Sequence, residues 1–109
     1  RLIVVTCNET TFLQCLSMNI PTIAYWDPNY VILEDCVIND FKKLYKIGIL
    51  FNSPEDAAMH INEKWDNIDT WWNMAKLQSI RSEFCNKYMH TSNNKDRVIQ
   101  WSAFFNQFL

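Results

Sequence analysis

The spacing of hydrophobic residues divides the first third of the chain into strand and helix patterns. Residues 2–6 and 21–26 are short apolar runs, and the second begins with a proline. Runs of this length are typical of strands buried on both faces of a parallel sheet. Between them, residues 11–19 carry apolar side chains three and four positions apart, which predicts a helix ending at Asn19. The order strand, helix, strand predicts a parallel pair joined by a right-handed crossover.

The middle of the chain continues the alternation. Residues 31–47 have helical spacing, with apolar positions three and four residues apart. Gly48 suits the left-handed position that often ends a helix. Residues 49–51 then predict a very short strand.

A further helix start is marked by side chains suited to capping. Ser53 is the expected cap, Pro54 the first helical residue, and Asp56 lies three residues after the cap in a capping-box arrangement. This helix is predicted to run through Trp65.

The C-terminal half is predicted to be rich in helix. Helical patterns cover residues 70–88 and 96–108, with a polar loop at residues 90–95 between them. The apolar face of the last helix contains Val98, Trp101, Phe104, Phe105 and Phe108. We therefore predict an α/β fold in which several helices pack on a small parallel sheet.

Composition narrows the classes of function. The chain has 109 residues, which suits a single domain, and 49% of them are hydrophobic, which is enough for a core. The single glycine, Gly48, excludes glycine-rich phosphate loops. The net charge is −2 and the basic residues are scattered along the sequence, so we expect no binding to nucleic acid.

The cysteines and histidines do not match a metal site. Cys7, Cys15, Cys36 and Cys85 form no CxxC pair, and their spacing fits no zinc pattern. We expect reduced thiols, no bound metal and no cofactor. No apolar run approaches the ~18 residues of a membrane span, and no signal peptide is evident. We expect a cytoplasmic chain. Because Arg1 is not an initiating Met and is followed directly by a strand pattern, we interpret residues 1–109 as part of a longer protein.

The turn between the first strand and the first helix is the best candidate for chemistry. Ligands of open parallel sheets bind at the carboxyl ends of strands, and a helix N-terminus there attracts phosphate. Asn8, Thr10 and Thr11 lie in this turn, and Gln14 lies one helical turn further on, within reach of a ribose hydroxyl. In the competing interpretation, Thr10 or Thr11 is an ordinary helix cap.

A second candidate follows the second strand, at Trp26-Asp27-Pro28-Asn29-Tyr30. Asp27 could bind sugar hydroxyls, and the flanking aromatic residues could stack on a ring. The competing interpretation is an Asx-type turn between packing aromatic residues.

Eight short segments of the chain form a distinctive series: Thr10–Gln14, Asn19–Ile23, Trp26–Tyr30, Gly48–Leu50, Ser53–Ala58, Trp71-Trp72, Phe84-Cys85 and Thr91-Ser92. Together they resemble a family of surface-carbohydrate transferases from O-antigen loci, which are similar to GT-B glycosyltransferases. The resemblance covers nearly the whole chain with order and spacing preserved.

The resemblance implies that residues 1–109 are one Rossmann-like domain at the C-terminal end of a longer enzyme. It implies a nucleotide-sugar donor, with Thr10 and Thr11 facing the diphosphate and Gln14 the ribose. Two residues depart from the family pattern. Gln14 replaces a carboxylate and is uncharged, and Glu9 replaces a glycine and adds a negative charge beside the expected diphosphate. No residue of the chain is identified as a catalytic base.

The expected function is sugar transfer from a nucleotide-sugar donor to a glycan or lipid-linked acceptor in surface polysaccharide synthesis, with a peripheral location at the inner membrane. Two alternatives stay open, a non-catalytic α/β interaction module and a polymer phosphotransferase that uses a CDP-linked donor. A truncated sheet would also leave an unpaired strand edge, so we expect partial dimerisation at high concentration.

Overall fold

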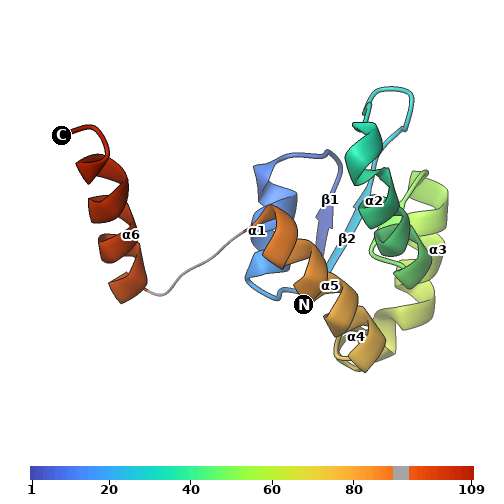
Figure 1. Cartoon of the computed structure of the whole chain (residues 1–109). Helices are drawn as coiled ribbons and strands as arrows, with labels where there is room; N and C mark the ends of the chain where they lie inside the picture. Colours follow the sequence, from blue (N-terminus) through green and yellow to red (C-terminus); the bar gives the residue numbers. More distant parts are fainter. Residues whose placement is uncertain (90–93) are drawn as a thin grey trace.

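A computed structural model describes residues 1–89 and 94–109 of the chain (Figure 1). Three strands form one parallel sheet in the order β1-β2-β3, with Ile3–Val5, Thr22–Tyr25 and Leu50–Phe51 as β1, β2 and β3. In the register, Val5 pairs with Ala24 and Tyr25 with Phe51. The predicted α/β fold with a parallel sheet is confirmed.

The helices follow the alternation expected from the sequence. In chain order they are α1 Thr10–Ser17, α2 Asp35–Ile47, α3 Pro54–Lys64, the 3-10 turn η1 Trp65–Asn67, α4 Ile68–Trp72, α5 Ala75–Tyr88 and α6 Asn94–Asn106. The helix α5 packs against both α1 and α2, so these three helices form one layer. The helix α3 packs on β2 and β3 away from that layer. We call residues 1–89 the α/β body.

The core of the α/β body lies between the sheet and the helices. Its largest fully buried side chains are Phe12, Leu16, Thr22, Ile23, Leu44, Ile49, Leu50, Trp72 and Leu77. The buried hydroxyl of Thr22 donates to the Ile20 carbonyl over 2.7 Å, so this polar group is satisfied inside the core. The C-terminal half is rich in helix, as predicted.

Two helix ends behave as their sequences predict. Ser53 Oγ accepts the backbone N–H of Asp56 over 3.2 Å at the start of α3, although no reciprocal bond from the Asp56 side chain is found among the described residues. Gly48 ends α2 with φ +83°, a conformation that residues with a Cβ rarely adopt. An added Cβ at Gly48 would also lie 2.9 Å from Cε1 of His60.

The helix predicted from residue 31 begins only at Asp35. The backbone N–H groups of Tyr30 and Val31 both donate to the Asp27 carbonyl, so the turn after β2 continues to residue 31. Glu34 is then extended and precedes the first helical residue. Val31 and Leu33 of this irregular segment pack partly against the core, whereas Ile32 is 92% exposed. The predicted start of the helix was therefore wrong.

The single helix predicted over residues 70–88 is two helices, α4 and α5. Met74 has non-helical backbone angles, φ −57° and ψ 133°, so α4 ends at Trp72 and α5 begins at Ala75. The Gln78 amide donates to Trp72 O over 2.8 Å and satisfies a carbonyl at the break, while Asp69 O accepts both the backbone N–H and the side-chain amide of Asn73. Side-chain partners of this kind are invisible to hydrophobic periodicity.

The last helix, α6, starts and ends two residues earlier than predicted. Its large apolar side chains are exposed, from 47% for Phe104 to 68% for Val98, and Phe108 in the turn after it is 73% exposed. Figure 1 shows α6 apart from the α/β body. The expectation that the whole helical half packs on the sheet is therefore wrong for α6. The predicted loop at residues 90–95 falls mostly outside the described residues.

Candidate functional site

The candidate site lies at the carboxyl edge of the sheet, where β1 and β2 end side by side. Because Val5 pairs with Ala24, the turn after β1 and the turn after β2 leave the sheet at the same edge. Asn8, Thr10, Thr11 and Gln14 come from the first turn and α1, and Asp27 comes from the second. All five side chains are exposed.

The N-terminus of α1 is free of side-chain caps. Glu9 is the capping residue by its backbone angles, but no side chain caps the helix. Phe12 N–H donates to Glu9 O over 3.0 Å, and no bond from the backbone N–H of Thr10 or Thr11 is found in the described part of the chain. The interpretation of Thr10 or Thr11 as an ordinary cap is therefore wrong. Two backbone donors and two hydroxyls stay available at the positive end of the helix.

Acidic charge stands directly beside these donors. Glu9 is exposed at the start of α1, where a carboxylate interacts favourably with the helix dipole. Desolvation and the neighbouring Glu9 carboxylate raise the pKa of the Cys7 thiol. Cys7 is therefore protonated at neutral pH and is not an activated nucleophile.

In the turn after β2, more of the side chains are already hydrogen-bonded or buried than in the turn after β1. The Asp27 carboxylate accepts the backbone N–H of Asn29 over 2.8 Å, which is the Asx-type turn of the competing interpretation. Trp26 is buried, with 4% of its surface exposed, so it cannot stack on a ligand. Tyr30 is 87% exposed and is the aromatic residue of this segment that a ligand can reach.

A cluster of aromatic rings supports both turns from below. Phe12 of α1 meets Trp26 edge-on, with ring centroids 5.5 Å apart. Phe41 meets Trp26 and Phe84 at 6.2 and 5.3 Å, and thus joins α2 and α5 to the same cluster. Because Phe12 follows Thr11 directly and Trp26 precedes Asp27, this packing fixes the two exposed turns relative to each other.

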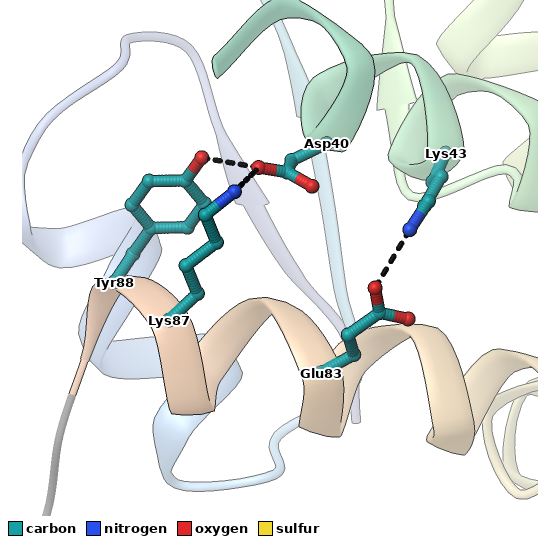
Figure 2. Close-up of polar contacts among 5 residues, drawn as sticks. All are labelled: Asp40, Lys43, Glu83, Lys87 and Tyr88. Carbon is teal, nitrogen blue, oxygen red and sulfur yellow. Dashed lines mark hydrogen bonds and ion pairs between the residues drawn. The ribbon is translucent and has the colours of Figure 1, made fainter. Parts of the chain in front are cut away.

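Polar contacts between α2 and α5 hold the same side of the body together (Figure 2). Asp40 accepts hydrogen bonds from the Lys87 ammonium over 2.6 Å and from the Tyr88 hydroxyl, and Lys43 pairs with Glu83 over 2.7 Å. The bonds from Lys87 and Tyr88 lower the pKa of Asp40, which is therefore ionised at neutral pH. These contacts join residues 40 to 48 positions apart, so no local sequence pattern predicts them.

Two concave surfaces lie away from the candidate residues. A cavity of about 690 Å³ at the start of β1 is lined by residues that include Val4, Ile61, Trp65 and Asp69. A groove of about 310 Å³ between α2 and α5 is lined by Lys43, Lys46, Ile47, Lys76, Ile80 and Glu83. Neither contains a residue predicted to bind the donor, and the five candidate residues are themselves exposed at the edge of the sheet.

Metal ligands do not gather in the described residues: no three His, Cys, Asp or Glu side chains there could hold an ion together. The four cysteines are free thiols. Within the same residues, no helix is both long and apolar enough to cross a membrane.

Comparison with known proteins identifies the family. The sequence model of the LIC12162 family transferase matches residues 1–105, which is nearly the whole chain. No curated protein and no solved structure matches. The chain therefore belongs to the LIC12162 family of transferases.

Proposed function

We propose that this LIC12162 family transferase transfers a sugar from a nucleotide-sugar donor, and that the β1–α1 turn binds the donor diphosphate. The observation that carries the proposal is the uncapped N-terminus of α1 at the carboxyl edge of a parallel sheet. Open α/β sheets bind ligands at this edge, and free helix N–H groups with a positive dipole end favour phosphate.

Each proposed residue has a distinct role. Thr10 and Thr11 supply hydroxyl and backbone donors to the diphosphate, and Asn8 supplies an amide at the same edge. Gln14 lies one helical turn further on and hydrogen-bonds the ribose. Asp27 has one carboxylate oxygen engaged by Asn29 N–H, and its other oxygen accepts a sugar hydroxyl.

In this proposal the chain is part of the donor-binding domain of a longer GT-B-like enzyme in surface polysaccharide synthesis. The acceptor is a glycan or a lipid-linked glycan, and the enzyme works in the cytoplasm at the face of the inner membrane. Helix dipole and hydroxyl groups would stabilise the leaving diphosphate as charge develops on it, without a bound metal. The residue that activates the acceptor would lie outside residues 1–109.

One observation favours a different function. The exposed carboxylate of Glu9 lies at the start of α1, where a diphosphate would approach, and the two negative charges would repel each other. A non-catalytic interaction module would have no need of an anion site here. The Glu9→Gln variant therefore separates the two proposals.

Nucleotide affinity of a small set of variants tests the donor site. Binding of UDP, GDP, CDP and ADP would be measured by calorimetry or NMR. We expect Thr11→Val to weaken binding of the preferred nucleotide and Glu9→Gln to strengthen it, because one change removes a donor and the other removes a repulsive charge. Thr70→Val, an exposed threonine on α4 that lines the distant cavity, is the matched control. Equal affinities for all variants would argue against this site, and a preference for CDP would favour a CDP-linked donor.

A further inference from the structure

The helix α6 carries a large unpartnered aromatic surface. Trp101, Phe105 and Phe108 are 59%, 58% and 73% exposed. The Trp101 and Phe105 rings stack on each other at 5.5 Å, and all the ring contacts found for these described residues stay within α6. Helices of this kind in soluble proteins normally bury such a face against a partner.

The spacing of these residues forms a seam. Val98, Trp101 and Phe105 of α6 and Phe108 in the turn just after it follow each other at intervals of three, four and three residues. The backbone N–H of Phe108 donates to Phe105 O over 3.1 Å, so this turn prolongs the helix. This spacing is the repeat that places side chains along one side of a helix to interlock with a second helix. Ile99 is equally exposed, at 66%, but helical geometry places it on the opposite side of α6.

We propose that this seam pairs with the same seam on a second copy of the chain. An antiparallel, two-fold arrangement lets identical surfaces cover each other completely and closes the assembly at a dimer. In that arrangement Trp101 of one copy faces Phe105 of the other. The dimer contact would then be made by α6. The sequence instead predicts dimerisation through the unpaired edge of the sheet.

The charge pattern of α6 favours a second copy over a lipid surface. From Val98 to Leu109 the sequence contains no charged residue. Helices that lie on membranes usually carry Lys and Arg along their polar face. In α6, Lys95 and Arg97 both lie in the first turn, and no Lys or Arg follows along the rest of the helix. The same absence lets two copies approach along the seam without like-charge repulsion.

The exposed area is enough for a weak dimer. Aromatic side chains offer about 150–250 Å² each, so the exposed parts of Trp101, Phe104, Phe105 and Phe108 amount to about 450 Å² on one copy. Pairing two copies would bury about 900 Å², which is below the roughly 1,200–2,000 Å² of stable specific interfaces and within the range of weak, transient ones. We therefore expect association that depends on concentration rather than a permanent dimer.

Sedimentation equilibrium of the 109-residue chain over a range of concentrations tests the proposal. We expect a monomer–dimer equilibrium that the double variant Trp101→Gln/Phe105→Gln weakens by about tenfold or more, because buried aromatic residues dominate such contacts. The control Ile99→Gln removes an equally exposed residue from the other side of α6 and should change the dissociation constant by less than about twofold. An unchanged melting temperature of each variant would show that the α/β body remains folded.

The NMR signals of the tryptophan side chains distinguish association through the seam from association through other apolar surfaces. In the unaltered chain, raising the concentration should shift the indole N–H signal of Trp101 in NMR spectra but not that of Trp65, which is 65% exposed on the α/β body. A chain that stays monomeric throughout would overturn the proposal. So would an Ile99→Gln effect as large as that of the seam variant, or concentration-dependent shifts at Trp65 instead.

Discussion

The α/β body and α6 use aromatic residues in opposite ways. In the body, Phe12, Trp26, Phe41 and Phe84 interlock and are at most 6% exposed, whereas the aromatic residues of α6 are 47–73% exposed. Both regions show helical spacing of apolar residues in the sequence. The comparison teaches that periodicity identifies the apolar face of a helix but not where the partner of that face is found.

The strongest test of this difference substitutes one aromatic residue in each region. Phe12→Ala should lower the free energy of unfolding by about 3–5 kcal/mol, because it leaves a cavity in a fully buried site. Phe105→Ala should change it by less than about 0.5 kcal/mol, since its side chain is mostly in solvent. Urea denaturation of monomeric samples measures both values. Similar losses for the two variants would contradict the division of the chain into two regions.

A smaller effect is expected at the end of α2. Gly48→Ala should destabilise the body by about 2 kcal/mol, because the left-handed backbone disfavours a Cβ and the His60 ring stands 2.9 Å from its position. In a His60→Ala background the steric part disappears, and the cost should fall to about 1 kcal/mol. The same cost in both backgrounds would show that the close approach of His60 contributes nothing.

The pH dependence of stability should also arise in the α/β body, from His60. His60 packs between Phe51 and Trp71, and burial lowers its pKa from the ordinary value of 6.5. The unfolded chain then binds more protons than the folded chain as pH falls below about 6.5, so the free energy of unfolding should decrease there. Urea midpoints from pH 8 to pH 5 measure this decrease, and His60→Phe should reduce it. An equally steep decrease in the variant would place its origin in other groups.

The smallest effect is expected from the ion pair between α2 and α5 in Figure 2. Lys43 and Glu83 are 46% and 60% exposed, and exposed pairs contribute little. Glu83→Gln should change the free energy of unfolding by less than about 0.5 kcal/mol in denaturant titrations. A decrease in the free energy of unfolding above about 1 kcal/mol would mean that this ion pair stabilises the α/β body more than exposed pairs usually do.

Much of the fold could be predicted from local sequence. The parallel order of the strands, the Ser53 cap and the Gly48 helix end depend on residues close in the chain, and each was predicted correctly. The break at Met74 depends on the Gln78 amide, which satisfies the freed carbonyl of Trp72, and the late start of α2 depends on backbone bonds to Asp27. Contacts of this kind have no periodic signal.

The candidate site was predictable in position but not in detail. Strand and helix order alone place Thr10, Thr11 and Asp27 at one edge of the sheet, and the structure brings them there. The burial of Trp26 involves ring contacts with Phe12 of α1 and Phe41 of α2, and neither is close to it in sequence. Whether these residues bind a donor stays a prediction.

The most direct test of the proposed donor site follows backbone amide signals of the chain by NMR during titration with UDP, GDP, CDP and ADP. We expect saturable shifts at residues 8–14 and at Asp27 for one preferred nucleotide, and unchanged signals across α6. Saturable shifts confined to another surface, such as the cavity beside Trp65, would contradict the proposal, as would unchanged spectra both for this chain and for a longer form of the protein.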